Sequence, residues 1–242
     1  MKKKHKATKA IILAAGIGRR LCPITNTTPK PLIEVGGTKM IETLLDALVK
    51  NEIENIIIVT GHLKEKFNYL TEKYNHISIT FLENPYYADC NNISSLYIAR
   101  DYLGDCIITD GDMIIHNPKI LNPHFDASGY CSAWTEDTDE WLQTIDDEDY
   151  VLSCSRTGGH KGWQLYSISF WTNEDGTKLR RHLEKTFERD ANTNIFWDDI
   201  PMFCFKEEYH LKIRRINAED LIEIDSLYEL CALDSSYLGR II

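Results

Sequence analysis

Two aspartates, Asp110 and Asp112, stand on either side of Gly111 at the end of a short apolar run, residues 106–109. Carboxylate oxygens are ligands that Mg²⁺ prefers, and this ion commonly binds one or two of them together with phosphate oxygens. The pattern Asp-Gly-Asp therefore predicts a magnesium site beside bound phosphates. On spacing alone, the alternative is an ordinary Asp-Gly turn with no chemical role.

A loop with two glycines follows the first apolar run, in the order Leu13-Ala14-Ala15-Gly16-Ile17-Gly18-Arg19-Arg20. Glycine lets the backbone approach an anion and point N–H groups at it, so this loop is a candidate phosphate site. It is neither a Walker A loop nor a complete Gly-x-Gly-x-x-Gly motif. Two cations favour anion binding. Arg20 can bind phosphate through two parallel hydrogen bonds, and Lys30 stands between two prolines on what we expect to be an exposed loop.

These residues carry a resemblance to a known family. Residues 11–32, with Leu-Ala-Ala-Gly-x-Gly-x-Arg-Leu and then Pro-Lys-Pro-Leu, are similar to the nucleotidyltransferases that act on sugar 1-phosphates and choline phosphate. Residues 87–97, the Asp-Asp pair at 198–199 and residues 223–226 resemble the choline-phosphate branch, and the resemblance spans residues 10–230. Cys22 departs from the pattern, because that position usually holds a basic residue.

The resemblance implies a role for each matching residue. It implies that Asp112 and Asp225 together hold Mg²⁺, and that they act with Arg20 and Lys30 in catalysis. It also implies that the nucleotide contacts Leu13, Ala14, Ala15, Gly16, Gly18, Asn91, Asn92, Ser95, Asp110 and Gly111, the two asparagines reading the base or ribose. Asp225 follows an apolar stretch, residues 221–224, that must return to the site if this assignment holds.

Aromatic and acidic residues gather in the second half of the chain. Aromatic faces beside carboxylates suit a quaternary ammonium, which gains cation–π attraction and needs no hydrogen bonds. The candidates for binding the acceptor are Trp141, Trp197, Asp198 and Glu223. For Trp141 the choice rests on its resemblance to a choline-contacting segment, and Trp197 is equally compatible with a core position. We expect Trp163, Trp171 and Phe196 to be core residues.

The function that the resemblance implies is Mg²⁺-dependent transfer of CMP from CTP to phosphocholine, which gives CDP-choline and pyrophosphate. Within the same class, the acceptor could instead be 2-aminoethylphosphonate, phosphoethanolamine or a sugar 1-phosphate. From a different class, the chain could be a nucleotide-binding module without turnover, although the joint presence of Arg20, Lys30, Asp112 and Asp225 disfavours this. A Ser-His-Asp or Cys-His pattern is not apparent, in keeping with a reaction that needs positioning and charge neutralisation only.

The pattern of apolar runs predicts the fold that positions these residues. Short apolar runs end at residues 14, 60, 82 and 109, and helical periods lie between them over residues 40–49, 63–74 and 93–103. This alternation predicts a doubly wound, mostly parallel, Rossmann-like α/β sheet. In the less regular second half, which we expect to form the acceptor pocket, we predict strands over residues 164–171 and 221–224 and a helix over 177–189.

Composition narrows the classes of function. The 242 residues carry 27 Lys and Arg against 37 Asp and Glu, a net charge of −10 that disfavours nucleic-acid binding. Seven scattered cysteines predict reduced thiols, and no run is long enough for a membrane span. We expect one domain over residues 1–242, a cytoplasmic location and a solvated basic tail over residues 1–9.

Overall fold

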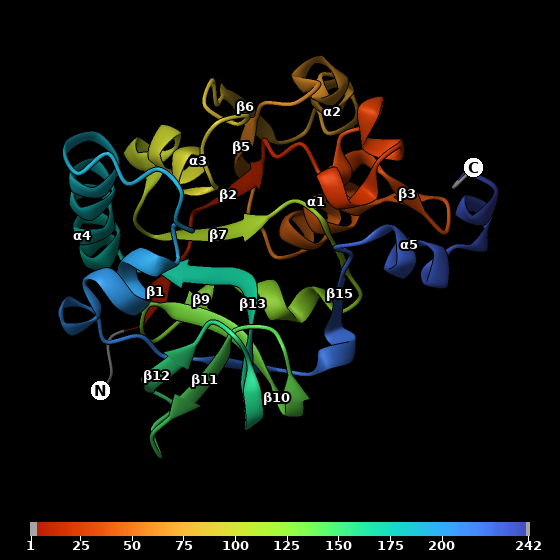
Figure 1. Cartoon of the computed structure of the whole chain (residues 1–242). Coiled ribbons are helices and arrows are strands. Elements are labelled where there is room, and N and C mark those ends of the chain that lie inside the picture. Colours follow the sequence, from red (N-terminus) through yellow and green to blue (C-terminus); the bar gives the residue numbers. More distant parts are fainter. Residues whose placement is uncertain (1–3, 241–242) are drawn as a thin grey trace.

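A nine-stranded sheet forms the centre of the computed structural model, which describes residues 4–240 (Figure 1). Seven of its strands follow one another in the order β12-β11-β13-β7-β2-β5-β6, and β10 and β14 are joined to it through β13. The bounds in chain order are β2 Lys9–Ala14, β5 Asn55–Thr60, β6 Ser78–Glu83, β7 Cys106–Asp110, β10 Gly129–Thr138, β11 Leu142–Ile145, β12 Val151–Ser155, β13 Gly159–Trp171 and β14 Arg214–Ile216.

The four strands β7, β2, β5 and β6 are mutually parallel, as the sequence predicts. β2, β5 and β7 are continuous apolar runs because both of their faces are covered. β2 lies between β5 and β7, so the strand order reverses between β2 and β7. In open α/β sheets, ligands bind at such a reversal, outside the carboxyl ends of the strands. Leu13 and Asp110 are paired at this edge, which brings the glycine loop next to the Asp-Gly-Asp segment.

Helices cover both faces of the parallel strands (Figure 1). On one face, Ile12 of β2 belongs to the same core cluster as the apolar side of α1. On the other face, Ile11 of β2 belongs to the cluster that contains the apolar sides of α3 and α4. The bounds are α1 Met40–Lys50, α2 Tyr69–Lys73, α3 Ile93–Ile98, α4 Asn173–Glu184 and α5 Leu227–Leu233. No helix in the described part of the chain is long and apolar enough to cross a membrane.

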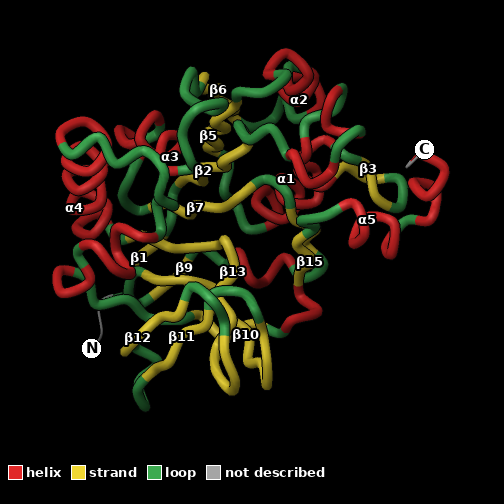
Figure 2. The backbone as a smooth tube through the Cα atoms, viewed as in Figure 1, coloured by secondary structure: helices red, strands yellow, loops and turns green. Residues whose placement is uncertain are grey.

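The second half of the chain adds antiparallel strands to this sheet. β13 pairs with β7 and continues into pairings with β10 and β11, and these strands lie below the parallel ones in Figure 2. Residues 4–240 also form three two-stranded sheets. They are β1 His5–Lys6 with β9 His124–Phe125, β3 Glu34–Val35 with β4 Thr38–Lys39, and β8 Met113–Ile115 with β15 Leu221–Glu223.

Four expectations need correction. Residues 63–74 form a 3₁₀ turn, Lys64–Phe67, followed by the short helix α2, and α3 ends at Ile98 before a second 3₁₀ turn, Arg100–Tyr102. α4 begins earlier than expected, because Thr172 caps it by accepting a hydrogen bond from the backbone N–H of Asp175. The expected solvated tail is wrong for residues 5–9, since β1 pairs with β9 and β2 begins at Lys9. Residues 1–3 of that tail lie outside the described residues.

Candidate active site

A pocket of about 380 Å³ lies at the carboxyl ends of the parallel strands, where the strand order reverses. Thirteen of the residues selected from the sequence line it: Leu13, Ala14, Ala15, Gly16, Gly18, Arg20, Lys30, Asn91, Asn92, Ser95, Asp110, Asp112 and Asp225. The predicted nucleotide and catalytic residues are therefore brought together by the fold. Gly111 does not line this pocket. Its backbone N–H donates to the carbonyl of Leu13, 3.0 Å away, which joins the two segments.

The glycine loop requires glycine at one of its two positions. Gly18 has a φ of +69°, and a Cβ there would lie 2.9 Å from Cγ2 of Thr25 and 3.2 Å from Cβ of Lys30. Gly16 has open space around it. Gly18 therefore allows the loop to pack closely against the segment that carries Lys30, and Gly16 leaves its backbone accessible from the pocket.

Lys30 lies at the centre of a network of charges. Its side chain pairs with Asp112 and, at 2.8 Å from Nζ to Oδ1, with Asp225. Burial alone would lower the pKa of Lys30, but the two carboxylates outweigh it and hold that pKa above its ordinary value. The expectation of an exposed lysine is wrong, because only 8% of Lys30 is accessible. The 3₁₀ turn Lys30–Leu32 and the flanking prolines direct its side chain inward.

Asp225 reaches the site because the strand before it returns. β15 pairs with β8, with Glu223 opposite Met113, as the assignment of Asp225 requires. After β15, the Glu229 carboxylate accepts hydrogen bonds from the backbone N–H groups of Asp225 and Ser226 in a capping box that starts α5. Oδ1 of Asp225 then lies 2.7 Å from Nη2 of Arg20. Both predicted catalytic cations thus contact Asp225.

Three carboxyl groups meet beside Lys30. One oxygen from each of Asp110, Asp112 and Glu223 lies within 4.8 Å of the others. Burial, followed by the charges of Asp112 and Glu223, raises the pKa of Asp110 well above its usual range. Burial, followed by Asp112 and Asp225, raises the pKa of Glu223 to about 8. A cation bound here would offset this repulsion and favour the ionised carboxylates.

These residues fit a divalent metal ion. Oδ1 of Asp112 is buried and has no hydrogen-bond partner among the described residues, which leaves a lone pair available to a cation. Asp110, Asp112 and Glu223 supply only oxygen donors, the kind that hard divalent cations prefer. Asp225, the second metal ligand that the resemblance implies, contacts Lys30 and Arg20 through Oδ1. The metal pair Asp112 and Asp225 stays a prediction.

The predicted acceptor residues occupy two different environments. Trp197 is 4% exposed and lies 5.9 Å, centroid to centroid, from both Tyr130 and Trp171 in the core. Trp141 is half-buried, with Phe196 and Phe203 edge-on to its ring. The role of both tryptophans in binding the acceptor stays a prediction. Of the expected core residues, Trp171 is fully buried, Trp163 is half-buried, and Phe196 is 46% exposed, contrary to expectation.

The charge of Asp198 contributes to the raised pKa of Asp110, after burial and the charges of Asp112 and Glu223. Burial raises the pKa of Asp198 itself to about 7. Asp198 and Glu223 are therefore two acidic groups that burial keeps partly protonated near neutral pH.

Asn91 and Asn92 tie the pocket to the segment before Asp198. Nδ2 of Asn91 donates to the carbonyl of Asn194, and Oδ1 of Asn92 accepts from the backbone N–H of Trp197 at 3.0 Å. Their predicted contact with the base or ribose stays a prediction.

Sequence reasoning missed other residues that line the pocket, among them Asn84, Tyr87, Cys90 and Ser94. Asn84 is 1% exposed and donates to the hydroxyls of Ser94 and Ser95. Its position directly after β6 was a usable signal, because the carboxyl ends of parallel strands meet at one edge.

Comparisons with known proteins agree with this geometry. The family described as nucleotidyl transferase matches residues 9–129. The 2-aminoethylphosphonate cytidylyltransferase of Lancefieldella rimae is 37% identical over 234 residues, which cover 96% of this chain and 94% of the relative. The chain belongs to the nucleotidyl transferase family. This nucleotidyltransferase is also 34% identical to the choline-phosphate cytidylyltransferase of Haemophilus influenzae, with 90% of this chain and 92% of the relative covered.

Solved structures show that most of the chain shares the fold of known nucleotidyltransferases. The CTP:phosphocholine cytidylyltransferase of Streptococcus pneumoniae matches with a TM-score of 0.85 and 32% identity, covering 94% of this chain and 98% of that one. The inositol-1-phosphate CTP transferase of T. maritima matches with a TM-score of 0.73 at 16% identity, a likeness of fold alone. The predicted α/β fold class and the status of an enzyme are confirmed.

Proposed function

We propose that this enzyme transfers CMP from CTP to a small acceptor that carries a phosphonate or phosphate at one end and a primary ammonium at the other. The acceptor we favour is 2-aminoethylphosphonate. One observation carries the choice: two half-buried carboxyl groups with raised pKa values lie at this site, Glu223 in the carboxyl cluster beside Lys30 and Asp198, whose charge acts on that cluster. A primary ammonium offers three N–H donors to such carboxylates.

The nucleotide half of the site suits a triphosphate. Gly16 and Gly18 open the backbone of the loop to an anion, and Arg20 and Lys30 supply positive charge beside it. Asn91, Asn92 and Ser95 are polar groups that line the same pocket, and they suit the ribose and the cytosine edge.

The chemistry proposed is an in-line displacement at phosphorus. An anionic oxygen of the acceptor forms a bond to the α-phosphorus of CTP as the bond to the β-phosphate oxygen breaks, and pyrophosphate leaves with that electron pair. Lys30 and Arg20 stabilise the negative charge that builds up, and the pocket holds the two reactants in line. Mg²⁺ held by Asp110, Asp112 and Glu223, or by Asp112 and Asp225, would neutralise further phosphate charge.

The surroundings of Trp141 favour a primary ammonium over a trimethylammonium. The guanidinium of Arg156 lies 3.6 Å over the ring of Phe203 and 5.9 Å from the ring centroid of Trp141. Its Nε donates to Asp199 at 2.6 Å, which fixes it there. Arg156 thus occupies the aromatic faces on which a trimethylammonium depends, whereas a primary ammonium can be bound by carboxylates without them.

Phosphocholine is the second candidate, and it is the acceptor that the sequence ranks first. Its support is the half-buried ring of Trp141, which follows Glu140 at the border of the site, together with the two choline-phosphate relatives from Haemophilus influenzae and Streptococcus pneumoniae. A trimethylammonium stacked on that ring would gain about 2 kcal/mol when desolvated.

A methylation series separates the two acceptors. We expect kcat/KM to fall stepwise from phosphoethanolamine through its monomethyl and dimethyl forms to phosphocholine, because each methyl group removes an N–H donor from the carboxylates. Asp198→Asn should flatten this series, and the matched variant at the exposed Asp190, Asp190→Asn, should leave it unchanged. A wild-type preference for phosphocholine that disappears in Trp141→Ala would overturn the primary-ammonium proposal in favour of the second candidate.

A further inference from the structure

His62 lies at the carboxyl end of β5, two residues after Thr60, and does not line the 380 Å³ pocket. It is nevertheless bonded to the loop that forms one wall of that pocket. Its backbone N–H donates to the carbonyl of Ala15 at 3.1 Å, and its ring Nε2 lies 2.7 Å from the carbonyl oxygen of Thr25. His62 therefore contacts the loop at two points, ten residues apart in the chain.

The contact with Thr25 is continued inside the loop. The hydroxyl of Thr25 donates to the carbonyl of Gly18 at 3.0 Å, and Thr25 is only 1% exposed. Gly18 must be glycine because Thr25 and Lys30 pack against its α-carbon. A chain of hydrogen bonds thus runs from the imidazole through Thr25 to the residue whose backbone turns the loop toward the pocket.

The carbonyl of Thr25 can only accept a hydrogen bond, so Nε2 of His62 must carry the proton in this contact. Its chain neighbour Gly61 packs closely against Tyr87, because an added Cβ would lie 2.8 Å from that ring. The imidazole lies 6.3 Å from the ring of Tyr87, centroid to centroid. The hydrogen bond from Nε2 of His62 to Thr25 therefore has a defined length and direction.

We propose that His62 is a positioning residue that sets the conformation of the nucleotide-binding loop, residues 15–28, before the nucleotide binds. The loop includes Arg20, whose guanidinium bonds to Asp225, so its geometry affects both the backbone N–H groups and a catalytic cation. This proposal rests on the proposed nucleotide site, and it assigns His62 an effect on nucleotide binding without contact to the nucleotide.

Two conservative variants separate the hydrogen bond from the bulk of the ring. The amide nitrogen of glutamine reaches about as far as Nε2 of histidine, whereas that of asparagine reaches only about as far as Nδ1. His62→Gln should therefore keep the bond to Thr25, and His62→Asn and His62→Ala should lose it. The matched control is His116→Ala, at an exposed histidine elsewhere in the fold.

Hydrogen exchange in the ligand-free protein tests the proposal without any substrate. The amides of Leu21 and Thr28 are bonded within the loop, to Gly18 and Ile24. We expect them to exchange about tenfold faster in His62→Asn and His62→Ala, the size of effect that one lost hydrogen bond gives. They should exchange at the wild-type rate in His62→Gln and in the control. Exchange at the wild-type rate in His62→Asn and His62→Ala would overturn the proposal. Equally accelerated exchange in these two variants and in His62→Gln would also overturn it.

Steady-state kinetics then connect the loop to function. His62→Asn and His62→Ala should raise KM for CTP about tenfold while KM for the acceptor and the unfolding midpoint stay near wild type, and His62→Gln should restore KM for CTP. The positioning role would be overturned if these variants raised KM for CTP and KM for the acceptor equally. It would also be overturned if their unfolding midpoints fell together with activity. If the wild type shows no turnover with CTP, the proposed function fails, and the exchange experiment still decides the role of His62.

Discussion

Lys30 and Asp225 form an ion pair, 2.8 Å from Nζ to Oδ1, between segments that are 195 positions apart in the chain. The same ammonium pairs with Asp112, which lies two residues after β7 ends at Asp110. One side chain therefore joins the nucleotide loop, the Asp-Gly-Asp segment and the returning C-terminal strand. This explains why Lys30 is buried.

Lys30→Met should destabilise the fold as well as impair catalysis. The variant leaves Asp112 and Asp225 facing each other without the cation, and we expect a loss of about 3 kcal/mol in the free energy of unfolding. Adding Asp225→Asn should recover part of that loss, because it removes one of the two charges. Urea denaturation checks both variants. The control is Lys64→Met, whose half-exposed ion pair with Glu83 should be worth less than about 1 kcal/mol.

Asp112→Asn should lower turnover by about a hundredfold or more while the protein stays folded. Asp112 belongs both to the carboxyl cluster and to the ion pair with Lys30, so its charge bears on metal and phosphate alike. The measurement is kcat at saturating Mg²⁺ and CTP, with Asp137→Asn, a mostly exposed aspartate of β10, as the control. Turnover at the wild-type rate in Asp112→Asn would show that Asp112 has no role in catalysis.

Asp198 should make the ligand-free protein less stable as the pH rises. Its pKa is raised by burial from the ordinary 3.8 to about 7, so the folded state holds a proton that the unfolded state has already lost. The stability due to this group is complete below about pH 4 and is lost as the pH rises through 7. Asp198→Asn should lose less unfolding free energy than the wild type between about pH 5 and pH 8. Parallel curves for the two proteins would contradict this prediction.

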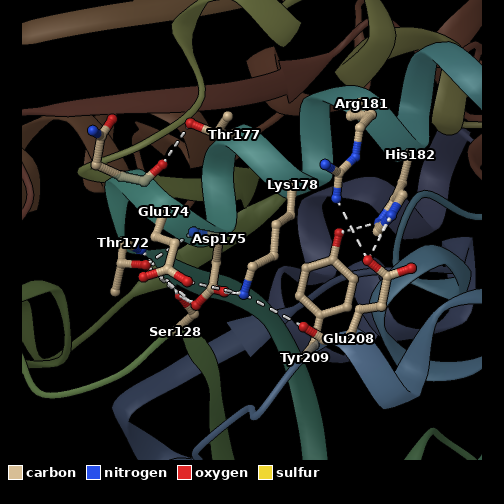
Figure 3. A network of polar contacts seen from close by, with 11 residues as sticks. Ser128, Thr172, Glu174, Asp175, Thr177, Lys178, Arg181, His182, Glu208 and Tyr209 are labelled. Atoms are coloured by element: carbon tan, nitrogen blue, oxygen red, sulfur yellow. Dashed lines mark hydrogen bonds and ion pairs between the residues drawn. The ribbon is translucent and has the colours of Figure 1, made fainter.

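His182 should make the protein less stable as the pH falls, which is the opposite of the effect of Asp198. Burial lowers its pKa below the ordinary 6.5, its Nδ1 lies 2.7 Å from the hydroxyl of Tyr209, and its ring stacks on Phe205. Figure 3 shows His182 on α4, directed at Tyr209 and Glu208.

The folded state then binds this proton less readily than the unfolded state, so stability falls as the pH drops below about 6.5. His182→Gln should flatten that part of the stability curve measured by urea denaturation, and His160→Ala, at a histidine whose side chain is 83% exposed, should not. An unchanged slope in His182→Gln would show that another group is responsible.

The parallel half of the fold could be predicted from the sequence because buried strands are continuous apolar runs, and β2, β5 and β7 are such runs. The lengths of the helices could not be predicted in this way. Phe67 and Leu70 are buried equally well by a 3₁₀ turn followed by a short helix as by one long helix, and Leu63, with a φ of +51°, breaks the continuity. The start of α4 had a local signal, the Thr172-x-x-Asp175 cap, that periodicity alone overlooks.

Much of the site could also be predicted, since the glycine loop, the Asp-Gly-Asp segment and the 87–97 segment all line one pocket. Other features of the site depend on contacts between residues that are distant in the chain, and local sequence patterns do not reveal such contacts. The burial of Lys30 depends on Asp225, the core position of Trp197 depends on Tyr130 and Trp171, and the role of His62 depends on Thr25. Each of these pairs forms only when separate segments meet at the sheet edge or in the core.

The release of pyrophosphate tests the central claim most directly. The enzyme is supplied with Mg²⁺ and each nucleoside triphosphate in turn, alone and with 2-aminoethylphosphonate, phosphoethanolamine, phosphocholine or glucose 1-phosphate. We predict release that requires both CTP and an amine-bearing acceptor, with the highest kcat/KM for 2-aminoethylphosphonate. Release that is fastest with a sugar 1-phosphate, or that is absent with CTP and every amine-bearing acceptor, would contradict the account.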